Sequence, residues 1–156
     1  MQIKDILTSD VETVSPDTRI HEVARKMKEL DIGAVPVCSG RRLLGMITDR
    51  DITVRAIAEG RDPRETPVSD AMTNEVIFCY QDQDVDDARQ LMEQYQIRRL
   101  PVVDEQDQLV GIVSLGDIAT RAHDDEEVGE TLKEVSQPTH VMEDETGTKE
   151  KRKKSK

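Results

Sequence analysis

Two stretches of the sequence decide the fold: Gly45-Met46-Ile47-Thr48-Asp49-Arg50-Asp51 and Gly111-Ile112-Val113-Ser114-Leu115-Gly116-Asp117. Each begins with a glycine, continues through two apolar residues to a hydroxyl residue, and reaches an aspartate three positions later. The two stretches lie 66 residues apart. Such recurrence of a pattern indicates an internal repeat.

The repeat extends over most of the chain. At an offset of 65, residues 3–37 align with 68–102, and one additional residue in the turn at 105–108 moves the offset to 66 for residues 44–56. Over these 48 aligned positions 13 are identical, and most other apolar positions match in kind. We infer that the chain contains a duplicated unit.

Hydrophobic periodicity predicts the order β-α-β-β-α in each copy. Apolar residues at three- and four-residue spacing indicate an amphipathic helix in each copy, and turn-rich segments between short apolar runs indicate a hairpin. The expected strands are 11–15, 34–38 and 43–47 in the first copy and 76–80, 100–103 and 109–113 in the second. The expected helices are 20–30 and 52–59, then 85–95 and 118–123.

A copy of roughly 60 residues buries little surface alone. We therefore expect an α/β (α+β) fold in which two repeats pack sheet to sheet about a pseudo-twofold axis. The expected units are repeat 1 at 1–60, a linker at 61–67, repeat 2 at 68–123 and a charged tail at 124–156. Low hydrophobicity and dense charge predict disorder in the tail from about residue 137.

Composition excludes several classes of protein. The chain has 33 acidic and 22 basic residues, a net charge of −11, and only 2% aromatic residues, which argues against general nucleic-acid binding. No apolar run is long enough to span a membrane and no signal-peptide pattern is present, so we expect a cytoplasmic protein. Cys38 and Cys79 occur in no paired motif, which favours reduced buried thiols over a disulfide or a zinc site.

The basic end of the tail, at 149–156, is the exception to the acidic composition. It is a candidate for contact with an anionic partner, RNA or a membrane surface. The alternative is a solvated tail without a specific partner.

The repeated motif has two interpretations. Its carboxylate can accept the hydroxyls of a ribose, while its hydroxyl and the free N–H groups of a helix start receive a phosphate. Alternatively, Thr48 and Ser114 cap the helices that follow them. The recurrence of the motif at two related positions, with arginines nearby, favours ligand binding.

Arginines supply the attraction that an anionic ligand would need in an acidic chain. Arg50 lies inside the first motif, and Arg98 and Arg99 precede the strand at 100–103. Guanidinium groups bind phosphate through paired hydrogen bonds. Arg55 and Arg121, one turn into the terminal helices, fit a phosphate contact or a solvated surface position.

In these motifs the chain resembles a tandem pair of cystathionine-beta-synthase (CBS) domains, or Bateman module, over about residues 1–123. The second copy carries the resemblance in 70–73, 97–104 and 111–118, and the first in 34–37 and 45–52. No single one of these motifs is diagnostic, but their ordered occurrence in both copies is specific.

The resemblance implies a regulatory module that binds adenosyl ligands, such as AMP, ADP, ATP or S-adenosylmethionine, in clefts between the copies. In such pairs Asp51 and Asp117 take the ribose, Thr48 and Ser114 hold ribose or phosphate, and Arg99 lines the phosphate side. The complete set of expected ligand-binding residues is Thr18, Val35, Pro36, Thr48, Arg50, Asp51, Arg99, Leu100, Pro101, Ser114 and Asp117. The resemblance also implies a homodimer formed through the helices.

The two copies differ at positions that matter for such a ligand. Ala34 stands in copy one where copy two has Arg99, and Gln83 stands in copy two where copy one has Thr18. We therefore expect two unequal clefts. The sequence does not indicate which cleft is occupied.

Catalysis has little support. His21, His123 and His140 lie in no readable constellation, and no glycine-rich phosphate loop is present. We expect a ligand sensor that is not an enzyme, has no catalytic cofactor and acts in trans on an unidentified partner protein. The alternative is an adaptor with empty clefts that acts through its surface or its tail. The ligand, any accompanying magnesium and the pathway stay open.

Overall fold

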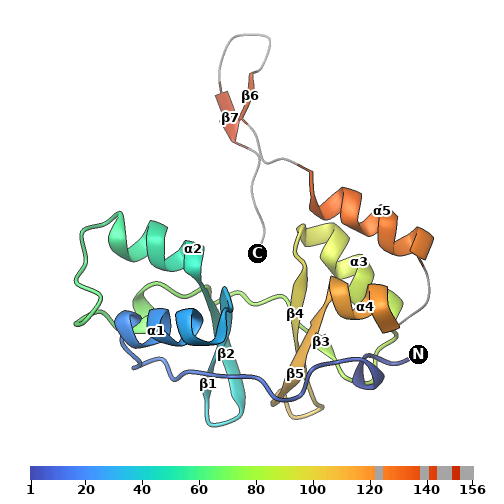
Figure 1. Ribbon diagram of the computed structural model, residues 1–156, viewed down its shortest axis with the longest axis horizontal. Helices are drawn as coiled ribbons and strands as arrows, with labels where there is room; N and C mark the ends of the chain where they lie inside the picture. The colour runs from blue at the N-terminus through green and yellow to red at the C-terminus, as the bar shows by residue number, and fades with distance from the viewer. Residues whose placement is uncertain (122–124, 138–140, 144–148, 152–156) are drawn as a thin grey trace.

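The structure is a computed structural model that describes residues 1–121, 125–137, 141–143 and 149–151. Figure 1 shows two similar halves side by side. The first half contains α1 (Ile20–Leu30), β1 (Ala34–Ser39), β2 (Arg42–Thr48), α2 (Asp49–Asp51) and the π-helical η2 (Ile52–Ile57). The second contains β3 (Cys79–Tyr80), α3 (Val85–Tyr95), β4 (Arg99–Val103), β5 (Leu109–Ser114) and α4 (Leu115–Arg121). Short 3-10 turns, η1 (Ile3–Asp5) and η3 (Val68–Asp70), precede the halves.

The two hairpins are built alike. β1 pairs antiparallel with β2, and β4 with β5, and the bulge falls at Val37/Cys38 in one and at the matching Val102/Val103 in the other. This agreement in register confirms two repeats of one mixed α/β unit. The expected pseudo-twofold fold is therefore present.

The first strand of each repeat is shorter than the sequence predicts. Instead of 11–15 there is a single parallel bridge between Val14 and Val37, and instead of 76–80 there is only β3. The residues that precede Val14 and β3 pair with the hairpin of the opposite half, where Thr8 bridges Ile112 and Thr73 bridges Met46. The chain cannot lie along both sheets over the whole stretch, so the strand is cut short.

The last helix of each repeat begins three residues earlier than expected, at Asp49 and at Leu115. The reason is the residue that precedes each helix, because Thr48 and Ser114 each cap a helix start through a side-chain oxygen. The helical turn therefore includes the aspartate of the motif in both repeats.

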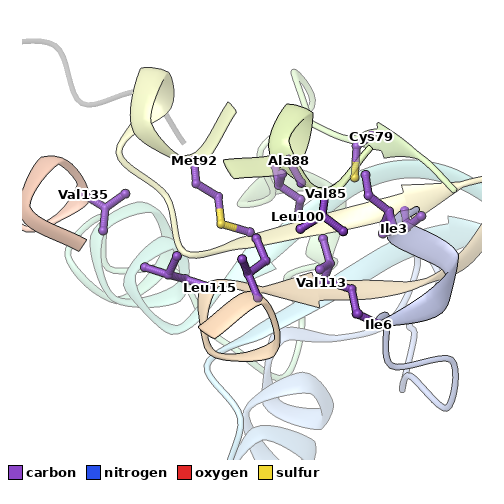
Figure 2. Packing of buried hydrophobic residues seen from close by; sticks show 12 residues of the cluster. Ile3, Ile6, Cys79, Val85, Ala88, Met92, Leu100, Val113, Leu115 and Val135 are labelled. Atoms are coloured by element: carbon purple, nitrogen blue, oxygen red, sulfur yellow. The ribbon is translucent and has the colours of Figure 1, made fainter. Parts of the chain in front are cut away.

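The halves exchange their N-terminal segments. Ile3 and Ile6 are fully buried in the core of the second half, where Figure 2 shows them beside Leu100 and Val113. Conversely, Val68 and Ala71 belong to the core of the first half. Each repeat therefore completes its hydrophobic core with residues that precede the other repeat in the chain.

Two arginines hold the exchanged segments in place. Arg121 Nη1 donates to the carbonyl oxygen of Ile6 at 2.9 Å, and Arg55 Nη1 donates to that of Met72 at 3.0 Å. Arg55 matches Arg121 at the offset of 66 residues, and Arg55 Nη1 also donates at 3.3 Å to the carbonyl oxygen of Ala71, which matches Ile6 at the offset of 65. Of the two roles open in the sequence, a phosphate contact or a solvated surface, the structure shows neither: Arg55 and Arg121 clamp the backbone of the exchanged turns.

The glycines of the motif permit a close approach of two backbones. Thr8 and Ile112 exchange N–H···O bonds of 2.8 and 2.9 Å, and Met46 and Thr73 exchange bonds of 3.0 and 2.8 Å. A Cβ atom on Gly111 would lie 2.4 Å from the Thr8 carbonyl oxygen, and one on Gly45 would lie 2.7 Å from the Thr73 oxygen. Only glycine fits at either crossing.

Beyond the repeats, α5 (Asp125–Val135) lies against α3 and α4 (Figure 1). The sequence predicts only a charged tail over this stretch, because its apolar residues are few and widely spaced. The described part continues with the short pair β6 (Val141–Glu143) and β7 (Lys149–Lys151). The disorder expected from about residue 137 concerns mostly residues outside those described, and it stays a prediction.

Both cysteines are buried and free. Burial raises the pKa of the Cys79 thiol to about 12, with a smaller contribution from Asp87, and burial also raises the pKa of Cys38. Thiols in this condition are protonated and unreactive at neutral pH. Among the described helices, none has the length and apolar character needed to cross a bilayer.

We predict that Gly111→Ala lowers the free energy of unfolding by about 1–3 kcal/mol, because the new methyl group collides with the Thr8 backbone. The matched control is Gly116→Ala in α4, where the new Cβ atom meets only Ser114 Oγ at 3.6 Å. The control should be neutral or slightly stabilising, since alanine favours helix. Urea titration followed by circular dichroism measures both. Equal stability of the two variants would contradict the crossing.

Candidate functional site: two clefts between the repeats

The larger cleft, named cleft 1, has a volume of about 500 Å³. The start of α2 and the two segments that precede β3 and β4 supply most of its walls. Its lining residues are Gly33, Ala34, Met46, Thr48, Asp49, Arg50, Thr73, Glu75, Val76, Ile77, Ile97, Arg98, Arg99 and Pro101. Both repeats contribute to it.

The second cleft, named cleft 2, has a volume of about 420 Å³. Its lining residues are Thr8, Asp10, Val11, Glu12, Leu30, Ile32, Gly33, Ala34, Arg99, Ile112, Ser114 and Asp117. At the offsets of the repeat, 8 and 10–12 correspond to 73 and 75–77 of cleft 1, and 112 and 114 correspond to 46 and 48. The two clefts are therefore symmetry mates.

The charges of the clefts differ. Cleft 1 has three arginines, Arg50, Arg98 and Arg99, against Asp49 and Glu75. Cleft 2 has three carboxylates, Asp10, Glu12 and Asp117, against Arg99 alone. The sequence difference between Ala34 and Arg99 does not make the clefts unequal, because both residues line both clefts. The inequality comes from Arg50 and Arg98 in cleft 1 and from Glu12 in cleft 2, where cleft 1 has Ile77; Asp10 is matched by the equally acidic Glu75.

Both Thr/Ser-x-x-Asp motifs form capping boxes. Thr48 N donates to Asp51 Oδ2 at 3.0 Å, and Asp51 N donates to Thr48 Oγ1 at 3.1 Å. In the second repeat, Ser114 N to Asp117 Oδ2 measures 2.8 Å and Asp117 N to Ser114 Oγ measures 3.0 Å. Helix capping is thus present in both repeats. Thr48 and Ser114 nevertheless line cleft 1 and cleft 2 respectively.

Asp51 and Asp117, the aspartates of the two motifs, differ in their exposure to the clefts. Asp51 is only 2% exposed and does not line cleft 1, whereas Asp117 is half-buried and lines cleft 2. The N–H groups at the start of α2 are also occupied, because Asp49 N donates to Gly33 O and Arg50 N to Asp49 Oδ1. An anion in cleft 1 must therefore be received by side chains, not by the free N–H groups that the sequence suggested.

The remaining expected ligand residues divide between core, cleft and turn. Val35, Pro36 and Leu100 are buried in the interior of their halves and line neither cleft, while Pro101 lines cleft 1. Thr18 lines neither cleft; its hydroxyl bonds Ser15 in the turn before α1.

Thr73 is a cleft residue that sequence reasoning missed. It lines cleft 1, and in the described part of the chain its Oγ1 is buried without a hydrogen-bond partner. A buried hydroxyl without a partner is costly unless something else bonds it. Its identity with Thr8 at the offset of 65 was the available signal. No group of three His, Cys, Asp or Glu in that part of the chain is arranged to hold a metal ion.

Comparison with known proteins identifies the class. The family model of the CBS domain matches residues 3–56 and again 68–124, so the chain belongs to the CBS domain family. It is 48% identical over 134 residues to the CBS domain-containing protein YhcV of Bacillus subtilis, covering 86% of this chain and 94% of YhcV.

Two solved structures of CBS pairs with adenosyl compounds share the fold. CBSX2 in complex with AMP has a TM-score of 0.69 and 25% identity, and the match covers 78% of this chain and 95% of CBSX2. The CBS domain pair of protein MJ0100, in complex with 5-methylthioadenosine and S-adenosyl-L-methionine, has a TM-score of 0.68 and 31% identity, covering 77% and 98%. These complexes were observed with CBSX2 and MJ0100.

We predict that Asp51→Ala lowers the free energy of unfolding by about 1–3 kcal/mol, with or without ligand, because it leaves the part-buried Thr48 N–H without its acceptor. The neighbouring Asp49→Ala serves as control, since Asp49 is exposed, and should change stability by less than about 0.5 kcal/mol. Thermal unfolding measures both. A stable Asp51→Ala variant would mean that the carboxylate has little structural role.

Proposed function

We propose that the protein is a ligand sensor that binds a phosphate-bearing adenosyl compound, AMP, ADP or ATP, in cleft 1. Binding would alter its conformation and be communicated in trans to a partner protein. The fold and the adenosyl complexes of similar CBS pairs support a regulatory binding module. The choice of cleft and of ligand is our inference from the charges.

The observation that carries the proposal is the group of three arginines on cleft 1 in a chain of net charge −11. No ion pair joins Arg50, Arg98 or Arg99 to a described carboxylate. Three arginines against Asp49 and Glu75 leave a positive balance on this cleft, which attracts a phosphate whose oxygens can accept hydrogen bonds from the guanidinium groups.

The rest of cleft 1 suits the adenosine part of such a ligand. Its volume of 500 Å³ falls within the range of about 300–1,000 Å³ typical of small-molecule sites. Val76, Ile77 and Ile97 offer apolar surface to the base, and Pro101 lies at the same wall. The hydroxyl of Thr73, which has no hydrogen-bond partner in the described part of the chain, can bond a ribose or phosphate oxygen.

Cleft 2 suits a different ligand. Three carboxylates around it oppose a phosphate. The half-buried Asp117 and Ser114 can still bond a ribose, so cleft 2 fits an adenosyl compound that lacks phosphate or carries positive charge, such as S-adenosylmethionine. Nucleotides should therefore prefer cleft 1.

A homodimer and a cytoplasmic location are part of the proposal. On the first half, Leu30, Val54 and Ile57 are about half exposed. Apolar side chains on neighbouring helices favour association of two copies through the helical face. The basic end of the tail stays a candidate contact for an anionic partner.

We predict that AMP stabilises the protein against thermal unfolding, by about 2.7 kcal/mol at 100 times its dissociation constant. Arg50→Ala, which removes an arginine that lines cleft 1 alone, should weaken AMP binding roughly ten- to hundredfold, because a hydrogen bond to a charged group contributes about 1.5–3 kcal/mol. Adenosine binding should change little. Isothermal titration calorimetry measures the affinities.

The matched control is Arg25→Ala, an exposed arginine on α1 paired with Glu29, which should bind AMP like the wild type. If neither an adenine nucleotide nor S-adenosylmethionine stabilises the protein at millimolar concentration, the proposal that it is a sensor of adenosyl ligands is wrong. The adaptor with empty clefts would then be favoured, and the search would turn to partner proteins.

A further inference from the structure

We propose that Arg98 couples occupation of cleft 1 to the docking of α5, so that a bound phosphate tightens α5 on the second repeat. The inference rests on the proposed function, because it requires a phosphate in cleft 1. It goes beyond it by naming the element that changes with the ligand. That element lies past residue 124, where the match to the CBS domain model ends.

Arg98 touches both the cleft and α5. Arg98 lines cleft 1, and its Nη2 donates to Ser136 Oγ at 3.1 Å, one residue after the end of α5. Its carbonyl oxygen accepts from Leu115 N at 2.8 Å, which fixes its backbone to the start of α4. One side chain on an anchored backbone therefore spans the distance between the ligand site and the helix.

The docking of α5 combines polar bonds with one apolar contact, and the Arg98 bond adds to the polar ones, which include Gln96 Nε2 donating to the carbonyl oxygen of Glu134 at 3.5 Å. Thr131 is fully buried and donates to Glu93 Oε1 of α3 at 2.6 Å, and Val135 enters the core of the second half. Figure 2 shows Val135 at the margin of that cluster, beside the residues of the main core. Leu132, between them, is 47% exposed. An isolated helix of 11 residues is marginal in water, so α5 depends on this docking.

The guanidinium geometry sets the direction of the coupling. Arginine has five N–H donors in a rigid fork, and Ser136 takes one from Nη2, which leaves others for a phosphate in the cleft. A phosphate bound to this conformer fixes it, so the entropy cost of ordering Arg98 is met once for both contacts. Ligand and docked α5 therefore favour each other, and the effect is reciprocal.

The coupling belongs to cleft 1 alone. At the position in the first repeat that matches Arg98 stands Gly33, which has no side chain to reach a helix. Cleft 2 therefore has no equivalent link.

The test uses the full chain with AMP and adenosine as probes. We expect AMP to slow hydrogen exchange of the α5 amides in the wild type, and adenosine, which has no phosphate, to leave them unchanged. Ser136→Ala should weaken AMP binding about three- to tenfold, the value of one hydrogen bond, and should abolish the slowing. Ser39→Ala, at the exposed end of β1, is the control and should behave like the wild type.

The outcomes separate the two proposals. If AMP binds the wild type but Ser136→Ala binds it equally well and α5 exchange is unaffected, the coupling is wrong and the proposed function stands. If AMP accelerates α5 exchange, the direction is wrong and the proposal fails. If AMP does not bind the wild type, both fail. A further variant, Arg98→Lys, tests whether the guanidinium group itself is needed. Lysine keeps a positive charge for the phosphate but lacks the planar set of donors, so this variant should bind AMP without slowing hydrogen exchange in α5.

Discussion

The whole arrangement depends on the crossing of the two exchanged segments over the opposite hairpins. Ile3 and Ile6 complete one core while Val68 and Ala71 complete the other, so neither repeat has a finished interior without its partner. The backbone bonds at Thr8–Ile112 and Met46–Thr73 fix the crossing. The exchange links the two halves into one cooperative unit.

The same crossing creates the clefts. After each crossing, the exchanged chain runs past the start of a terminal helix before it joins its own repeat, and a hollow is left between the two. Duplication alone would make the two hollows equal. Their difference comes from a few substitutions: Arg50 and Arg98 line one cleft where the other repeat has glycine, and Glu12 lines the other cleft where its counterpart is Ile77. A symmetric scaffold therefore presents two sites of opposite electrostatic character to solution.

The repeat, the mixed α/β fold and the hairpins could be predicted from sequence because they follow from periodicity within each copy. The exchange could not, since nothing local in Ile3 or Val68 indicates which core it joins. For the same reason the cleft residues at 10–12, 73 and 75–77 were missed, although they align between the copies. Val35 and Leu100 were placed beside a ligand by resemblance, yet alternation along the strand turns them into the core. The helix at Asp125–Val135 could not be predicted because its apolar residues are few and its stability comes from packing against α3 and α4.

The central claim is that a nucleotide places its phosphate among the arginines of cleft 1. A crystal structure of the protein grown with AMP tests it most directly. The account predicts density for the phosphate within hydrogen-bond distance of Arg50 and Arg98, with the Thr73 hydroxyl bonded to the ligand. A phosphate in cleft 2 beside Asp117, or a cleft 1 without nucleotide at saturating AMP, would contradict it.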